Sequence, residues 1–347
     1  MKIKRLLMSF LLIFTIIIVL IFSFFFSKFS LMKEDGSLVD DHTHMDYEEV
    51  VNASEEDTQL MDELSNVLEE KEAVLATKEI DEDKGVFNLL LIGTDERTGS
   101  YSDNARGDTC LLVSINTSQE TPVLSLISFE RGMGVPILEG QYQGQYDWLT
   151  HTFRYGGADL LLKEVRECFK VDVDYYIRVN FNAFKSAIDA VGGVDVELDE
   201  KEVQYFIDGF KYKEAKIGIN HLNGEMALNY SRLREIDSDW VRIQRQREVI
   251  LSALQQLSEM SLLEINDAVN EVLPLIKTNI SELKVAELLL LAPKLTSLKT
   301  QQMTIPQKGT YGIMKGMGNR NVLAVDFEVN AQILHDFLYE PEISNER

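Results

Sequence analysis

Hydrophobic and polar positions follow one another in three different ways along this chain. Residues 6–27 form an uninterrupted run with no charged side chain, and 22 residues of helix at about 1.5 Å each reach across the hydrocarbon core of a bilayer. Three basic residues within residues 1–5 precede the run, which places that end in the cytoplasm. Bulky phenylalanines at 24–26 stand where a cleavage site would need small residues. We therefore expect a single-pass, uncleaved membrane anchor at 6–27, a cytoplasmic tip at 1–5 and an extracellular remainder.

The second zone is dominated by acidic residues. Residues 33–84 contain 19 Asp and Glu against 4 Lys, a net charge of −15. Such a run is solvated and repels itself, so we expect residues 28–84 to form a disordered extracellular stalk. Leucine and valine recur at helical spacing between residues 60 and 75, which predicts a short amphipathic helix within this stalk.

The third zone, residues 85–347, alternates two kinds of hydrophobic pattern. Apolar runs rich in β-branched residues predict strands at 86–92, 109–116, 123–129, 175–180, 194–198 and 300–304. Helical periodicity predicts helices at 158–169, 183–191, 223–230, 239–260, 281–291 and 328–338. Strands that alternate with helices indicate an α/β fold, with a mixed central β-sheet sandwiched by helices and preceded by the one N-terminal transmembrane helix.

Composition narrows the function. A formal net charge of −23 and a pI near 4.6 exclude a simple nucleic-acid-binding protein, because phosphate contacts along a nucleic acid need an excess of Lys and Arg. Only two cysteines are present, Cys110 and Cys168, and we expect both to be buried thiols. The chain also lacks the nucleotide-binding P-loop, the dinucleotide-binding glycine motif, the zinc-protease helix motif and the serine-hydrolase nucleophile motif.

The arginines are concentrated in two segments. Five of the 13 arginines in residues 85–347 fall between positions 232 and 247, and three more, Arg97, Arg106 and Arg131, lie at the margins of predicted strands. A guanidinium group matches phosphate oxygens in bidentate geometry and stays charged at any working pH. This distribution is consistent with a phosphate site. It is equally compatible with surface arginines that pair with the many glutamates.

The order of the strands places several of these side chains together. Asp95 and Arg97 follow the first predicted strand, Arg106 and Asp108 precede the second, and Arg131 follows the third. If the second strand is antiparallel to its neighbours, all five side chains lie at one edge of the sheet. Two carboxylates there provide the oxygen ligands that Mg²⁺ prefers, although aspartate is also common in turns for local reasons.

The predicted helix at 239–260 carries a third polar group. Asp239, Arg242 and Gln246 are spaced i, i+3 and i+7, so they lie within one arc of roughly 60° on the helix. Ile243 borders this arc, which indicates the wall of a cleft. The alternative is an ion pair between Asp239 and Arg242 on the helix surface.

Eight segments, taken in order, resemble the LytR-CpsA-Psr family of envelope-biogenesis enzymes over about residues 85–250. They are Asn88–Arg97 (NLLLIGTDER), Arg106–Thr109 (RGDT), Val123–Arg131 (VLSLISFER), Tyr155–Gly157 (YGG), Ala190–Val196 (AVGGVDV), Leu222–Leu228 (LNGEMAL), Arg232–Arg234 (RLR) and Asp239–Gln246 (DWVRIQRQ). The resemblance implies an enzyme that transfers a glycopolymer, such as teichoic acid or capsular or wall polysaccharide, from an undecaprenyl-pyrophosphate carrier in the membrane lipid to peptidoglycan, through a phosphodiester bond.

The same resemblance assigns roles to the candidate residues. Asp95 and Asp108 would hold Mg²⁺, or Mn²⁺ in its place, and Asp239 would orient Arg242 or act as the base for the incoming hydroxyl. The pyrophosphate would be bound by Arg97, Arg106, Arg131, Arg232, Arg234, Arg242 and Gln246. Among all these, the catalytic set would be Asp95, Arg131, Arg232, Arg234 and Asp239.

Two positions depart from the family pattern. The family usually carries an aspartate directly after the arginine that corresponds to Arg131, and here that residue is Gly132. It also commonly places a lysine near Trp148, and an indole does not replace an ammonium group beside phosphate. Two other functions therefore stay open: a non-catalytic protein that binds the carrier lipid, and a pyrophosphatase that releases the polymer to water.

Overall fold

The computed structural model describes residues 33–34, 61–80, 83, 85–96, 101–102, 105–118, 121–281, 284 and 298–340. The expected membrane anchor, Arg97 and most of the helix expected at 281–291 lie outside these residues. Within the described part of the chain, no helix combines the length and the apolar character needed to cross a membrane.

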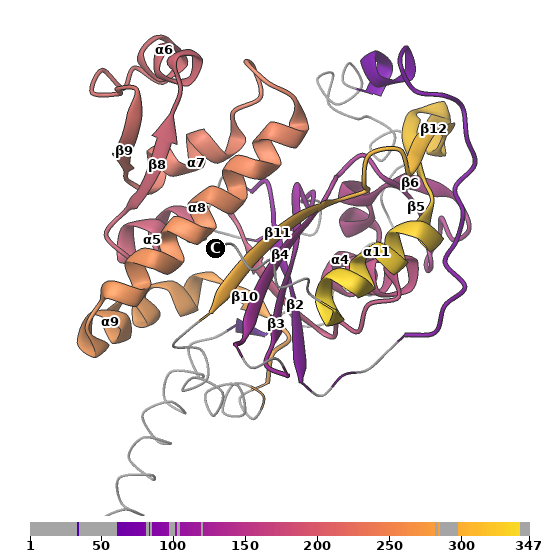
Figure 1. Ribbon diagram of the computed structural model, residues 1–347, viewed down its shortest axis with the longest axis horizontal. Helices are drawn as coiled ribbons and strands as arrows, with labels where there is room; N and C mark the ends of the chain where they lie inside the picture. The colour runs from indigo at the N-terminus through magenta and orange to yellow at the C-terminus, as the bar shows by residue number, and fades with distance from the viewer. Residues whose placement is uncertain are drawn as a thin grey trace, which may run out of the picture.

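A seven-stranded mixed sheet runs through the middle of the molecule (Figure 1). Its strands, in spatial order, are β1 (Lys33–Glu34), β10 (Lys277–Thr278), β7 (Tyr175–Val179), β2 (Val86–Gly93), β3 (Thr109–Asn116), β4 (Val123–Phe129) and β11 (Lys299–Ile305). Strand β3 is antiparallel to both β2 and β4, whereas β7 is parallel to β2 and β11 to β4. The C-terminal ends of β2 and β4 therefore meet the start of β3, as the site prediction required.

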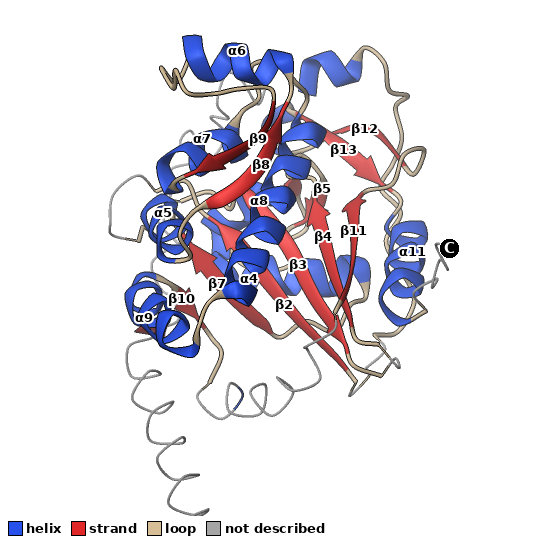
Figure 2. Cartoon of the chain, turned by 60° about the vertical axis from the view of Figure 1, so that its left-hand side comes forward, coloured by secondary structure: helices blue, strands red, loops and turns tan. Residues whose placement is uncertain are grey.

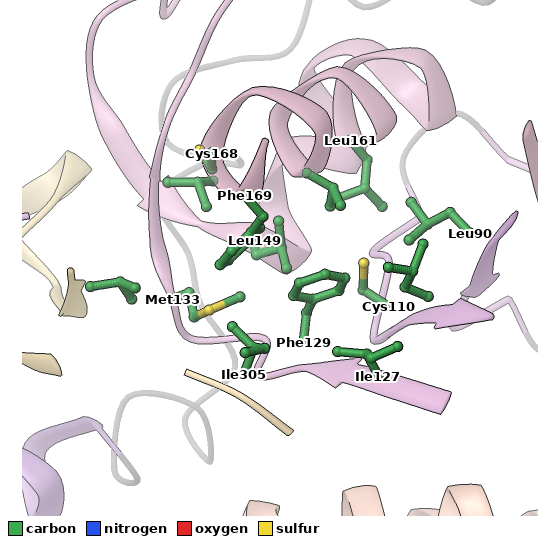
Figure 3. Packing of buried hydrophobic residues seen from close by; sticks show 14 of the residues in the cluster. Leu90, Cys110, Ile127, Phe129, Met133, Leu149, Leu161, Cys168, Phe169 and Ile305 are labelled. Carbon is green, nitrogen blue, oxygen red and sulfur yellow. The ribbon is translucent and has the colours of Figure 1, made fainter. Parts of the chain in front are cut away.

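Helices cover both faces of this sheet, which confirms the predicted α/β sandwich. On one face, α4 (Leu149–Phe169) and α11 (Phe327–Tyr339) enclose the main core, where Phe129 of β4 packs against Phe169 with ring centroids 4.8 Å apart (Figure 3). On the other face, α8 (Asp239–Glu259) brings Ile250 and Leu251 onto the leucines of β3 and β4. Every residue of β4 is buried, as expected of a strand covered on both sides.

A smaller lobe continues from the end of the sheet and has a core of its own (Figure 2). It contains α5 (Phe181–Ala190), β8 (Val194–Leu198), α6 (Glu200–Asp208), β9 (Gly218–Leu222), α7 (Gly224–Arg232) and α9 (Leu262–Val272). Two further hairpin-like pairs flank the sheet: β5 (Gly134–Pro136) with β6 (Tyr146–Trp148), and β12 (Tyr311–Lys315) with β13 (Asn321–Val325). Single turns of 3₁₀-helix occur at Leu273–Leu275 and Met317–Asn319.

Residues 61–80 belong to this folded domain, so the prediction of a disordered stalk is wrong for them. Met61 is buried in the main core, and Leu64 and Leu68 pack against it. Further along, the segment is extended, and the backbone of Val74 exchanges hydrogen bonds of 3.0 and 2.7 Å with Val325 and Phe327. Of the apolar residues at helical spacing, Leu64 and Leu68 pack onto the domain, whereas Val67, Val74 and Leu75 are exposed. Within residues 61–80, only residues 61–65 are helical. The buried side chain of Met61 and the backbone hydrogen bonds hold this acidic segment against the domain.

The structure also corrects the start of one helix. The periodicity predicts a helix at 158–169, whereas α4 begins at Leu149 and is interrupted at Gly156 and Gly157. Gly157 has a φ of 65°, a left-handed conformation that glycine adopts without strain. The two glycines conceal the first helical turns from a pattern search, and those turns carry part of the site.

Candidate functional site

The edge of the sheet brings four predicted residues together: Asp95, Arg106, Asp108 and Arg131. The Arg106 backbone N–H donates to Asp95 Oδ1 at 3.0 Å, and its Nε lies 3.2 Å from Asp95 Oδ2. Its Nη2 lies 3.3 Å from Asp108 Oδ2, so one guanidinium group bridges both carboxylates. Arg131 Nη1 lies 3.9 Å from Asp108 Oδ1. The predicted meeting of these side chains at one sheet edge is therefore confirmed.

Asp239, at the first position of α8, is the centre of a second group. Its carboxylate is only 2% exposed, and its Oδ1 lies 2.8 Å from Arg242 Nε, 3.4 Å from Arg131 Nε and 4.0 Å from Arg234 Nε. Burial alone would raise the pKa of Asp239, but the three guanidinium groups outweigh burial and lower it to about 2. Asp239 is thus a permanent anion that fixes three arginines.

Arg131 joins the two groups, because it contacts Asp108 through one nitrogen and Asp239 through another. The two groups of side chains differ sharply in their exposure to solvent. Asp95 is 29% and Asp108 18% exposed, whereas the side chains of Arg131 and Asp239 are 6% and 2% exposed. Asp95 and Asp108 therefore form a solvent-accessible acidic rim. Next to this rim lies a buried layer in which Asp239 holds the side chains of Arg131 and Arg242.

Two other predicted residues, Arg232 and Gln246, form no ion pair with this network in the described part of the chain. The guanidinium of Arg232, at the end of α7, stacks 4.4 Å from the centre of the Phe181 ring, and no ion pair in the described part of the chain joins it to Asp239. Gln246 donates to the Ser231 carbonyl at 3.4 Å, which ties α8 to α7. Arg97 lies outside the described residues. The roles of Arg97, Arg232 and Gln246 toward a phosphate stay predictions.

Glu130, which directly precedes Arg131, was not among the predicted site residues. Its side chain is buried, and its Oε2 accepts a hydrogen bond of 2.6 Å from the Gly132 backbone N–H. Burial, and then the nearby negative charge of Asp239, raise the pKa of Glu130 to about 8, against the opposing effect of Arg131. Near neutral pH Glu130 therefore holds a proton beside ionised Asp239. Its only signal in the sequence is a place next to Arg131 at a strand end.

Thr150 and Arg154, in the first turns of α4, were also missed. Thr150 Oγ1 donates to Asp108 Oδ1 at 3.2 Å. Burial, and then repulsion from Arg106, lower the pKa of the Arg154 guanidinium, while the charges of Asp95 and Asp108 oppose this shift. Arg154 is therefore close enough to the acidic rim to be influenced by each of its charges. The predicted helix began after both residues, at position 158, so neither was a candidate.

The two departures from the family pattern lie in different environments. Trp148 is buried, and its Nε1 donates to the Asn321 carbonyl at 2.8 Å. At Gly132, an added Cβ would lie 2.1 Å from Met61 Cε and 3.1 Å from Glu130 Oε2. The space beside Gly132 is therefore already filled, by the segment at 61–80 and by the Glu130 carboxyl group.

The carboxylates at the sheet edge are the candidate ligands for a divalent metal ion. Among the described residues, no group of three or more His, Cys, Asp or Glu side chains is placed to hold a metal ion. Asp95 and Asp108 provide two partly exposed carboxylates. Since Mg²⁺ usually takes one or two carboxylates together with phosphate oxygens, this pair suits Mg²⁺ when a phosphate ligand completes the site.

The structure is thus an α/β sandwich with arginines gathered at one end of its sheet, and guanidinium groups match the geometry of phosphate oxygens. The family model named LytR_cpsA_psr matches residues 48–334, and the chain belongs to this family.

The chain is similar to proteins with named activities. It is 33% identical over 235 residues, 66% of this chain and 70% of the relative, to the Bacillus subtilis "Polyisoprenyl-teichoic acid--peptidoglycan teichoic acid transferase TagT". It is 31% identical to the Bacillus anthracis transferase TagU over 56% of this chain, and it spans 61% of the length of that relative. The solved structure of TagT (YwtF) with bound octaprenyl pyrophosphate lipid covers 78% of this chain and 97% of its own, with 27% identity and a TM-score of 0.54.

Proposed function

We propose that this protein transfers a glycopolymer from a polyprenyl-pyrophosphate carrier, undecaprenyl pyrophosphate in the cell, to peptidoglycan. The observation that carries the proposal is the network of Asp95, Arg106, Asp108, Arg131 and Asp239 at one sheet edge. The transferase names of its relatives and the octaprenyl pyrophosphate bound to TagT support the same substrate class.

The transfer exchanges one phosphorus–oxygen bond for another. The oxygen of an acceptor hydroxyl on peptidoglycan attacks the phosphorus that bears the glycan, and the bond from this phosphorus to the bridging oxygen breaks. The glycan becomes joined to peptidoglycan by a phosphodiester, polyprenyl monophosphate leaves, and the hydroxyl proton passes to water. No nucleotide is needed, because the pyrophosphate is itself the activated bond. Catalysis then consists of positioning and of stabilising negative charge.

The buried arginines are suited to that task. Arg131 and Arg242 are held by Asp239 before any ligand arrives, so they need little reorganisation to stabilise the charge that develops on phosphate oxygens. The lowered pKa of Asp239, about 2, makes it a weak proton acceptor, which favours the orienting role over that of a base. The side chains of Arg106, Arg232 and Arg234 are more exposed than those of Arg131 and Arg242. We assign these three arginines to direct binding of the phosphate oxygens.

We assign Asp95 and Asp108 to a Mg²⁺ ion, or to Mn²⁺ in its place. Such an ion neutralises charge on the phosphate oxygens of the substrate. Membrane attachment through residues 6–27, which lie outside the described residues, would keep the domain on the outer face of the membrane beside the lipid carrier.

The decisive experiment incubates the full chain in detergent with Mg²⁺, a lipid-pyrophosphate-linked glycan and peptidoglycan oligomers, and reads the products by mass spectrometry. The proposal expects a phosphodiester-linked adduct together with polyprenyl monophosphate. A matched Arg234→Ala variant should lose this product while it keeps the parent's melting temperature. Free glycan phosphate would identify a pyrophosphatase instead, and tightly bound but unreacted lipid would identify a carrier-binding protein.

A further inference from the structure

Arg154 lies on the face of α4 that is turned toward the acidic rim. It stands one helical turn after Thr150, whose hydroxyl donates to Asp108 at 3.2 Å, and residues at i and i+4 share a helix face. The charges of Arg106, Asp95 and Asp108 also act on Arg154, so its guanidinium lies within electrostatic range of the same three groups. Two observations of different kinds thus put Arg154 at the proposed pyrophosphate site.

The guanidinium of Arg154 is incompletely satisfied there. Its Nε is buried and has no hydrogen-bond partner among the described residues. By contrast, the Arg106 guanidinium contacts both Asp95 and Asp108. A guanidinium group does not lose its proton in proteins, so Arg154 keeps a positive charge and a buried N–H without an acceptor. Such a group costs folding free energy unless a ligand supplies the acceptor.

Arg154 is also the one permanent cation in the first turns of α4. Residues 149–157 contain one other basic side chain, His151, whose pKa is lowered by burial and by the charges of Arg320 and Arg154, against the opposing effect of Asp147. Trp148, just before the helix, is uncharged and donates to the Asn321 carbonyl. Any permanent positive charge that the first turns of this helix contribute to the site must therefore come from Arg154.

We propose that Arg154 is a further pyrophosphate-binding residue, which donates to the phosphate oxygens of the carrier lipid beside Asp95, Arg106 and Asp108. This inference rests on the proposed function, because it concerns the same ligand. A second arginine beside Arg106 matches a ligand with two linked phosphate groups better than one with a single phosphate. Arg154 therefore contributes to the preference for pyrophosphate over monophosphate.

The test measures binding of octaprenyl pyrophosphate and octaprenyl monophosphate to the full chain in detergent micelles by isothermal titration calorimetry. We expect Arg154→Ala to weaken pyrophosphate binding by about 10- to 100-fold and monophosphate binding by less, since a lost charge-assisted hydrogen bond has that magnitude. Arg154→Lys should retain part of the affinity. Arg154→Met, which keeps most of the side-chain volume, should behave like the alanine variant even if alanine impairs folding.

The matched control is Arg166→Ala, further along α4, whose guanidinium pairs with Asp172 and Asp174. This variant should bind both lipids as the parent does. Equal pyrophosphate affinity in the parent and in Arg154→Met would overturn the role of Arg154 and leave the proposed function intact. A parent protein that binds neither lipid would instead refute the proposed function, and the inference with it.

Discussion

Asp239 shows how one buried residue organises the arginines of the site. Its carboxylate is 2% exposed and contacts Arg131, Arg234 and Arg242, which come from three different elements or loops. A buried charge is tolerated when opposite charges and hydrogen bonds surround it, and each member of such a group depends on the others. The arginines are therefore held ready by an acid that need not itself touch the substrate.

Replacing this acid tests that dependence. We expect Asp239→Asn to lower the free energy of unfolding by about 3–5 kcal/mol, because it leaves Arg131 and Arg242 buried without their counterion. Urea denaturation of the variant and the parent measures this difference. Asp174→Asn, at a carboxylate that is 64% exposed, serves as the control and should change stability by less than about 1 kcal/mol. Equal stability of the Asp239→Asn protein would show that Asp239 does not organise the cluster.

Glu130 predicts a pH dependence of stability. Its pKa rises from the ordinary 4.5 to about 8 on folding, so the folded protein retains a proton that the unfolded chain releases within this window. Stability from this residue therefore falls as the pH rises from about 4.5 to about 8. Glu130→Gln cannot titrate, and its melting temperature should decline less between pH 5 and pH 8 than that of the parent. The same decline in both proteins would contradict the buried, protonated state of Glu130.

At the scale of elements, strand direction assembles the acidic rim. Because β3 is antiparallel to β2 and β4, residues that follow one strand and precede the next meet at one edge. The first turns of α4 complete this edge through the Thr150 hydroxyl. The rim is thus formed by four chain segments that are separate in the sequence.

The rim predicts how the protein responds to divalent ions. In the presence of octaprenyl pyrophosphate, the parent should bind Mg²⁺ or Mn²⁺, and combined Asp95→Ala and Asp108→Ala substitutions should abolish this binding and the metal dependence of transfer. Titration with Mn²⁺, followed by electron paramagnetic resonance, reports binding directly. Asp172→Ala, remote from the rim on the Arg166 ion pair, provides the matched control. Full activity of the parent in excess chelator would show that the metal assignment is wrong.

At the scale of the whole molecule, the N-terminal segment 61–80 is part of the folded domain. Met61 fills the space beside Gly132, and the backbone of Val74 extends the β12–β13 pair by bonding to Val325 and Phe327. The site therefore depends on a segment outside the region in which the sequence motifs occur. Removing that segment would expose the apolar surface that Met61, Leu64 and Leu68 cover.

This arrangement predicts a clear effect of truncation. A chain that begins at residue 85 should melt at a lower temperature than one that begins at residue 58, because it loses the buried side chain of Met61 and the partly buried side chains of Leu64 and Leu68. Full burial of one such side chain contributes about 1.5–3 kcal/mol, so the loss should be readily visible in a thermal unfolding experiment. Equal melting temperatures would show that the segment contributes little to the fold.

The sequence by itself determined the main strands of the sheet, several helices and several members of the site. Strands β2, β3 and β4, the polar face at the start of α8 and the edge that carries Asp95, Arg106, Asp108 and Arg131 were all predicted, since periodicity and spacing along the chain are local properties.

Only the tertiary structure decided how the charges act on one another. Arg131 and Asp239 are more than a hundred residues apart in sequence, and the proton on Glu130, the role of Arg154 and the burial of residues 61–80 depend on which distant segments surround them. Burial and the distance between charges set pKa values and ion pairing, and both are properties of the packed molecule.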